Sequence, residues 1–119
     1  MITIVEVKED SAGNPVVEDI CLSSCPRPHL IVWHYVGGSA NAAVTWGFNW
    51  VKGQEPPPGI FSNFMAIDDT PWAVISDKYN GTGGPWPYNL TVSTSPGEKK
   101  KPVRGSSPGG GGNPNIKNN

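Results

Sequence analysis

The sequence predicts an all-β fold: a seven-stranded antiparallel sandwich of two sheets, followed by a disordered C-terminal tail. Apolar residues alternate with polar ones or form short runs, and Gly, Pro and Asn interrupt them about every ten residues. No window spaces apolar side chains at three and four, as an amphipathic helix would. The 119 residues and a hydrophobic content of 36% suffice for one domain with a core.

The seven expected strands span residues 2–7, 16–22, 29–36, 42–50, 60–67, 72–77 and 86–94. Residues 11–15 form the first turn, because Gly13 permits positive φ and Pro15 fixes its own φ. Pro26 and Pro28 would each remove a ladder donor, so residues 25–28 lie outside a sheet. The third strand is apolar on both faces at residues 30–33, which places it centrally in its sheet.

The fourth and last strands alternate most clearly. One face of the fourth strand carries Val44, Trp46, Phe48 and Trp50, and one face of the last carries Trp86, Tyr88, Leu90 and Val92. Residues 54–59 form a stiff, proline-rich loop. The expected core includes Leu30, Val32, Trp33, Val44, Trp46, Phe48, Leu90 and Val92.

Residues 1–96 are therefore expected to form the sandwich domain, and residues 97–119 a flexible, basic tail. This segment has four consecutive glycines at 109–112 and is rich in Lys, Pro and Ser. Such a segment buries too little apolar surface to offset the entropy lost on ordering, about 1–2 kcal/mol per residue. Ile116 is the only large apolar residue of this tail besides Val103. One alternative stays open, in which residues 113–118 add to a sheet edge.

Charge is divided unevenly between the two parts. Residues 1–94 carry four Lys or Arg against nine Asp or Glu, a net charge of −5, whereas residues 95–119 carry five against one, a net charge of +4. An acidic body argues against nucleic acid as a ligand. Residues 1–7 lack the pattern of a signal peptide, and no run approaches the roughly 18 apolar residues of a membrane span. We expect a soluble, cytoplasmic protein that does not engage a membrane.

Short motifs in the strands suggest a group of proteins. Ile31 and Trp33 form an I-x-W motif, Trp46 and Phe48 a W-x-F motif, and residues 88–92 a Y-x-L-x-V motif, while residues 113–118 read N-P-N-I-K-N. Together they resemble small uncharacterised bacterial proteins with a cupredoxin-like or immunoglobulin-like β-sandwich, in which Asp stands at the position of Asn113. The resemblance implies the fold and no activity.

A metal site is considered because Cys21, Cys25, His29 and His34 lie within fourteen residues. Their spacing is not that of a zinc finger, and two histidines five residues apart on one strand point to opposite faces. Residues 77–94 contain no Cys, His or Met for a blue-copper site. We therefore expect no metal and no other cofactor. Whether Cys21 and Cys25 form a disulfide stays open, and reduced thiols are favoured in the cytoplasm.

Catalytic chemistry has few candidates. Asp68, Asp69 and Asp77 are carboxylates in turn-like positions and would be the general acid and base of an enzyme. Solvated turn residues are the simpler interpretation. The sequence has no nucleophile elbow and no phosphate-binding loop, so no catalytic residue is assigned.

The five tryptophans are the strongest indication of function. Trp33 and Trp46 are core candidates, whereas Trp50 and Trp72 are expected at strand ends near prolines. Aromatic rings at strand ends stack on sugars or contact peptides. We assign Trp50, Trp72 and Trp86 as candidate ligand-binding residues.

These observations favour a non-enzymatic binding or interaction module for a protein or carbohydrate ligand. One alternative is an enzyme or degenerate metal protein that uses Asp68, Asp69 and Asp77 or the cluster of Cys21, Cys25 and His29. A weaker alternative is docking of the basic residues 99–104 to an acidic partner.

Overall fold

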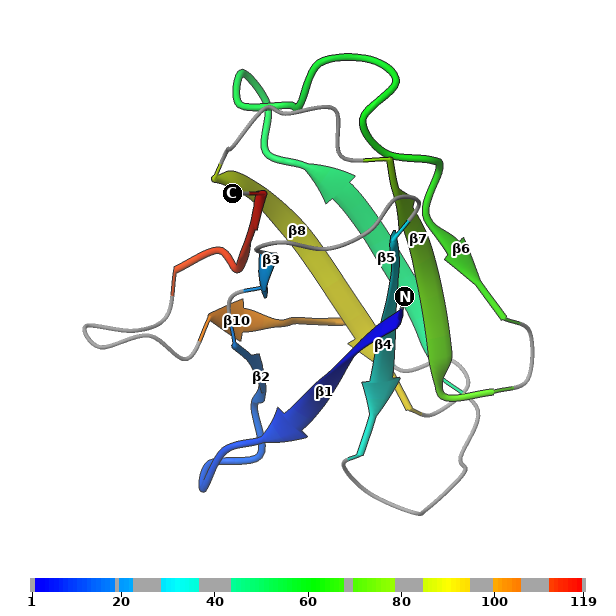
Figure 1. The fold of residues 1–119 in the computed structure, drawn as a ribbon. Helices are drawn as coiled ribbons and strands as arrows, with labels where there is room; N and C mark the ends of the chain where they lie inside the picture. Colours follow the sequence, from blue (N-terminus) through cyan, green and yellow to red (C-terminus); the bar gives the residue numbers. More distant parts are fainter. Residues whose placement is uncertain are drawn as a thin grey trace.

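In the computed structural model, every regular element among the described residues is a β-strand, which confirms the all-β prediction (Figure 1). The described residues are 2–18, 20–22, 29–36, 44–67, 70–78, 85–94, 100–105 and 112–118. They form eleven strands in two sheets, where the sequence predicts seven strands. No membrane-crossing helix is present in this part of the chain.

The first sheet has six strands in the order β10-β2-β1-β4-β7-β6. Their bounds are Arg104–Gly105 for β10, Pro15–Val17 for β2, Ile2–Glu9 for β1, His29–Tyr35 for β4, Trp72–Asp77 for β7 and Met65–Ala66 for β6. As predicted, β4 is central in its sheet. β4 lies between two long strands, β1 and β7, and β6 is a short edge strand.

The second sheet has the order β3-β11-β8-β5, and β9 also pairs with β8. The bounds are Ile20–Leu22 for β3, Asn115–Asn118 for β11, Trp86–Ser93 for β8, Thr45–Trp50 for β5 and Lys101–Pro102 for β9. The long strands β5 and β8 pair over their full alternating stretch, from Thr45 opposite Ser93 to Trp50 opposite Tyr88.

Most strand pairs are antiparallel, but the prediction of a wholly antiparallel sandwich is wrong for three of them. β1 pairs with β4, β2 with β10 and β3 with β11 in parallel. The chain crosses from the first sheet to the second between β2 and β3 and returns as β4. This crossover lets β4 lie beside β1 in the same direction, as parallel pairing requires.

The predicted strand 16–22 is therefore two strands in different sheets. β2 ends at Val17, Glu18 is exposed, and β3 begins at Ile20. The predicted strand 60–67 is likewise reduced, to β6 and a single bridge between Phe61 and Asp77. In both places two polar residues, Glu18-Asp19 and Ser62-Asn63, interrupt the apolar residues, and the prediction of one continuous strand passed over this interruption.

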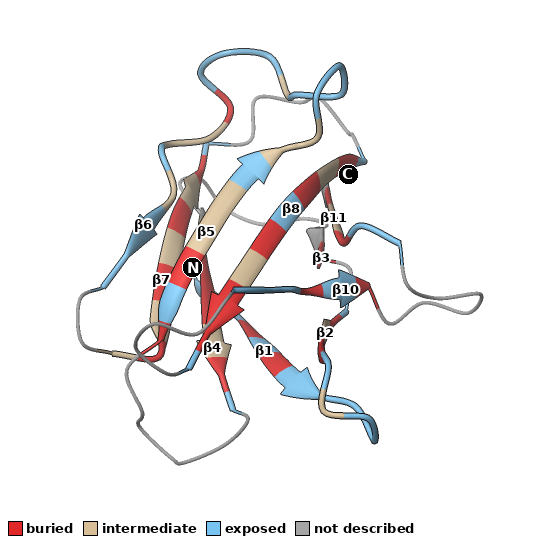
Figure 2. Cartoon of the chain, turned by 180° about the vertical axis from the view of Figure 1, so that it is seen from behind, coloured by how far each residue is buried: buried red, intermediate tan, exposed pale blue. Residues whose placement is uncertain are grey.

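The core lies between the two sheets. Buried residues alternate along β7 and β8 (Figure 2). Of the residues predicted to be buried, the structure buries Trp33, Val44, Trp46, Leu90 and Val92 within the core cluster. Val32 is also buried, at 9% exposed, but it lies on the outer face of the first sheet and outside that cluster. Leu30 and Phe48 are only half-buried, which corrects the prediction. Leu30 is an even-numbered residue of β4, whose odd-numbered residues face the core, and Phe48 lies on an edge strand.

Part of the predicted tail belongs to the fold. Ile116 is fully buried, Val103 is 3% exposed, and both join the core cluster. β11 pairs with β3 on one side and with β8 on the other. The expectation that nothing beyond residue 96 contributes to the core is therefore wrong for these residues, and the alternative that this stretch adds a strand is confirmed for Asn115–Asn118. Residues 95–99, 106–111 and 119 lie outside the described residues.

Candidate functional site

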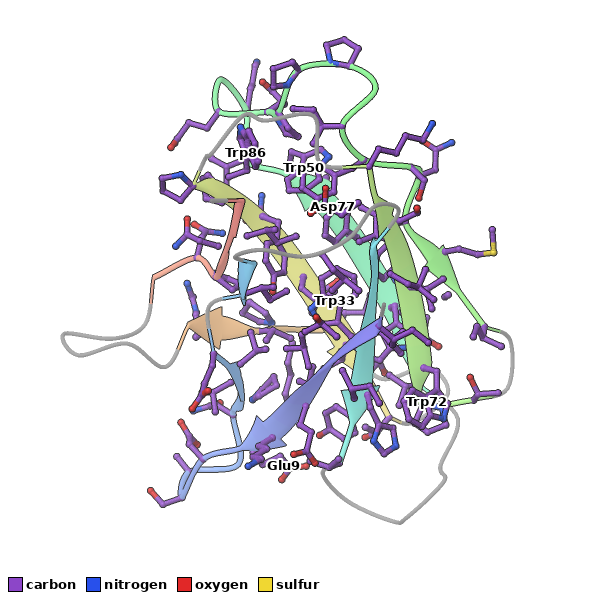
Figure 3. The ribbon with its side chains drawn as sticks, viewed as in Figure 1. Glu9, Trp33, Trp50, Trp72, Asp77 and Trp86 are labelled. Atoms are coloured by element: carbon purple, nitrogen blue, oxygen red, sulfur yellow. The ribbon has the colours of Figure 1, made fainter. Side chains whose placement is uncertain are left out.

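The three tryptophans assigned to ligand binding do not converge on one site. Trp50 and Trp86 lie at one end of the sandwich, and Trp72 lies toward the other end (Figure 3). Trp50 and Trp72 are half-buried, whereas Trp86 is only 6% exposed. Trp86 therefore closes the end of the core and presents little ring surface.

Trp50 and Trp86 share an aromatic neighbour, Phe61. The ring centroids of Trp50 and Phe61 are 4.9 Å apart, and those of Phe61 and Trp86 are 5.6 Å apart. Phe48 stacks on Phe64 with centroids 4.7 Å apart. These rings belong to a cluster that also contacts the core, and Phe48, Trp50, Phe61 and Phe64 remain partly exposed at its border.

Trp72 has a different environment, on the outer face of the six-stranded sheet. It lies opposite His34 in the β4–β7 register, and the two rings stack with centroids 3.9 Å apart and planes 10° apart. One face of the indole is thus covered by a neighbouring strand. The ring is an integral part of the sheet surface.

The outer face around Trp72 is unusually apolar. Even-numbered residues of β1 and β4 point outward because the odd-numbered residues contribute to the core. Ile2 is 61% exposed, Ile4 58% and Met65 62%. An antiparallel sheet normally presents polar side chains to water on its outer face, so this face departs from the usual pattern.

The strand register aligns these side chains in one row. Ile4 lies opposite Val32, Val32 opposite Val74, and Val74 opposite Met65. We call Ile4, Val32, Val74 and Met65 the apolar row. It crosses four adjacent strands, β1, β4, β7 and β6, which lie side by side in Figure 1.

The next row along the strands is polar and aromatic. Glu6 lies opposite His34, and His34 opposite Trp72. Lys8, also exposed, approaches Glu6 to 4.0 Å. The apolar row is therefore bordered on β1 by charges of both signs.

A small cavity lies elsewhere, beside the end of β1. Its volume is about 180 Å³, and the residues lining it are Glu9, Gly13, Pro15, Tyr35, Val92, Ser93, Thr94 and Lys101. The Tyr35 hydroxyl donates a 2.6 Å hydrogen bond to Glu9 Oε1. The Glu9 carboxylate is exposed and accepts this hydrogen bond. The residues that line the cavity around it do not indicate a particular catalysed reaction.

Of the predicted acid–base residues, only Asp77 lies in the described part of the chain. Asp77 is fully buried at the end of β7, so it is not a solvated turn residue, and Asp68 and Asp69 lie outside the described residues. Among described acids, Glu55 has its pKa lowered by the Gly53 N–H, which donates to both carboxylate oxygens at 3.0 and 3.1 Å. Glu55 lies in an exposed loop outside the cavity.

The predicted cluster of Cys21, Cys25 and His29 lies outside the residues whose side chains are described. Within the described part of the chain, no group of three or more His, Cys, Asp or Glu residues is arranged to hold a metal ion.

The chain matches no protein-family model, no curated protein and no solved structure. Its function must therefore be inferred from its own surface. Sequence reasoning proposed Trp72, whose role in binding stays a prediction, and it missed the apolar row. A signal was present, because Ile2, Ile4, Val5 and Val7 make the first strand apolar on both faces.

Proposed function

We propose that the chain is a non-enzymatic binding module that docks a protein partner on the outer face of its six-stranded sheet. The observation that carries the proposal is four exposed apolar side chains on this face: Ile2, Ile4, Met65 and Ile67 are 61%, 58%, 62% and 44% exposed. Between Ile4 and Met65 in the apolar row, Val74 is half-buried and Val32 is 9% exposed. Several large apolar side chains exposed on one face of a folded domain are typical of interaction sites. Burying one such side chain completely is worth about 1.5–3 kcal/mol.

A protein fits this face better than a carbohydrate, the other ligand class that the sequence predicts. Sugars stack on the open faces of aromatic rings, whereas the apolar row is aliphatic. The Trp72 ring, which lies beside the row, is stacked on His34 at 3.9 Å. The expected partner presents a flat apolar face, with polar groups that meet Glu6 and Lys8 at the border.

The scaffold of this module is, in our proposal, a β-sandwich of the immunoglobulin-like or cupredoxin-like kind. Two sheets that share one core support it. In such a scaffold the sheets bury their inner faces against each other, and the outer face of the first sheet stays available to a partner.

The proposal is tested by site-specific photo-crosslinking. A benzophenone amino acid replaces Met65 in the apolar row, and in a control chain it replaces the exposed Ser11 in the first turn. With extract from the source cells, we expect a discrete crosslinked protein from position 65 that is absent from position 11. Adding Ile4→Lys to the position-65 chain should abolish that product, because a charge in the row must be desolvated on docking.

Ile4→Lys changes an exposed residue and should leave the thermal midpoint unchanged within error, so loss of crosslinking would not reflect unfolding. A product that persists with Ile4→Lys would contradict the proposal. A carbohydrate ligand whose binding depends on Trp50 and survives Ile4→Lys would also contradict it.

A further inference from the structure

The edge strands of the two described sheets differ greatly in length. β10 and β6 have two residues each and β3 has three, whereas β5 has six. Short edge strands protect a sheet from pairing with other chains, as do charged side chains and prolines on the edge. β5, with the sequence TWGFNW, has neither charge nor proline. It is the long, unprotected edge of this molecule among the described strands.

The pairing with β8 shows which backbone groups of β5 face outward. Tyr88 N–H donates to the Pro114 carbonyl of the segment leading into β11, so the backbone of Tyr88 faces away from β5. Its partner Trp50 therefore belongs to a pair without mutual hydrogen bonds. Val51 N–H donates to Pro87 O at 3.1 Å, as this register requires.

Hydrogen-bonded and non-hydrogen-bonded pairs alternate along an antiparallel ladder. The N–H and C=O groups of Trp46, Phe48 and Trp50 are thus directed away from β8, toward the outer edge. No described strand pairs with this edge. Its backbone offers the alternating donors and acceptors that an added strand needs.

Aromatic side chains border the same edge. We call Phe48, Trp50, Phe61 and Phe64 the aromatic ledge; all four are partly buried and pack against the core from its border. Phe48 and Trp50 come from β5, and Phe61 and Phe64 from the segment before β6. β5 and β6 lie on the same side of the sandwich in both views (Figures 1 and 2). A strand added to β5 would place every second side chain against this ledge.

The opposite surface of β5 carries a positive charge. A β-carbon built on Gly47 would lie 3.6 Å from Lys100 Nζ, so the ammonium group lies over the middle of the strand. Neighbouring strands are about 4.8 Å apart. An acidic side chain on the outer surface of an added strand would therefore come within reach of Lys100.

From these observations we propose that the β5 edge captures an extended peptide segment of a partner protein as an additional strand. The segment carries apolar side chains at alternate positions, which cover the aromatic ledge, and acidic side chains between them, which approach Lys100. The backbone groups of Trp46, Phe48 and Trp50 supply the hydrogen bonds. The β5 edge is separate from the apolar row, and this proposal can be tested independently of the function proposed above.

The probe for the test is a blocked peptide of about seven residues, a usual strand length, that alternates Glu with Val and Phe. Its affinity is measured by the change in tryptophan fluorescence and by amide shifts of residues 46–50. Two further peptides carry N-methyl groups on one or the other alternating set of residues. N-methylation of the residues whose N–H groups face β5 should weaken peptide binding about tenfold or more, because hydrogen bonds to β5 are lost. N-methylation of the residues whose N–H groups face away should have little effect. Equal effects of the two sets would overturn the proposal.

Protein variants test the charge contact. Lys100→Glu should weaken binding of the acidic peptide, and a peptide with Lys in place of Glu should restore it. Lys8→Glu is the matched control, since it makes the same charge change on the other sheet, and it should have no effect on affinity. Loss of binding in both variants would show attraction to net charge alone and would overturn the proposal.

The apolar-row variant Ile4→Lys separates this site from the proposed function, because it should leave peptide affinity unchanged. A second copy of the chain is the competing occupant. If amide shifts at residues 46–50 depend on protein concentration and the peptide does not compete, β5 pairs with itself, and the proposal is wrong.

Discussion

The hydrogen bond between Trp33 and Tyr88 links the two sheets at the level of single residues. Trp33 Nε1 on β4 donates to the Tyr88 hydroxyl on β8 at 3.2 Å, and both residues are fully buried. The rings also meet edge-on, with centroids 5.6 Å apart. Polar atoms in a core need partners, so this pair fixes how the two sheets are placed relative to each other.

Tyr88→Phe should therefore destabilise the fold by about 1–3 kcal/mol, because it leaves the buried indole N–H of Trp33 without this acceptor. The free energy of unfolding in urea measures the effect. Tyr35→Phe is the matched control: its hydroxyl donates to Glu9, whose exposed carboxylate can bind water instead. The loss there should be smaller. Equal losses in the two variants would contradict the role given to the Trp33–Tyr88 contact.

At the scale of elements, β11 makes the most unexpected contribution. Ile116 is its central buried side chain, and the strand fills the space between β3 and β8. Ile116→Ala should cost about 2–5 kcal/mol of unfolding free energy, as for other fully buried aliphatic residues. Ile2→Ala is the control, since Ile2 is 61% exposed and should change stability by less than about 0.5 kcal/mol. Similar effects of both substitutions would show that β11 does not stabilise the fold.

The elements also show which features a sequence of this kind reveals. β5 and β8 follow from local alternation, and β4 and β7 from short apolar runs, all of which depend only on the residues of each strand. β11 does not, because Ile116 is a single apolar residue whose burial depends on β3 and β8 together. The candidate site is similar: Trp72 was proposed from its local context, but the apolar row combines four strands through their register.

At the scale of the whole molecule, the acidic and basic parts of the chain are held together in one fold. The acidic body of residues 1–94 has a net charge of −5 and residues 95–119 have a net charge of +4. The described strands of this basic segment join both sheets: β10 pairs with β2, while β9 and β11 pair with β8. Attraction between the two parts therefore acts within one fold and should stabilise it, whereas the sequence predicts a flexible tail outside the fold.

Salt should weaken this attraction, since the Debye length falls from about 30 Å at 0.01 M to about 3 Å at 1 M ionic strength. We expect the thermal midpoint of the intact chain to fall as NaCl is raised over this range, by an amount that corresponds to roughly 0.5–2 kcal/mol, the sum of a few exposed contacts. Replacing the exposed Lys100, Lys101 and Arg104 by Gln should lower the midpoint at low salt and remove most of its dependence on salt. Differential scanning calorimetry of both chains measures this. If the two chains respond to NaCl in the same way, the charge of the C-terminal strands does not contribute to stability, and their attachment rests on Val103, Ile116 and backbone pairing alone.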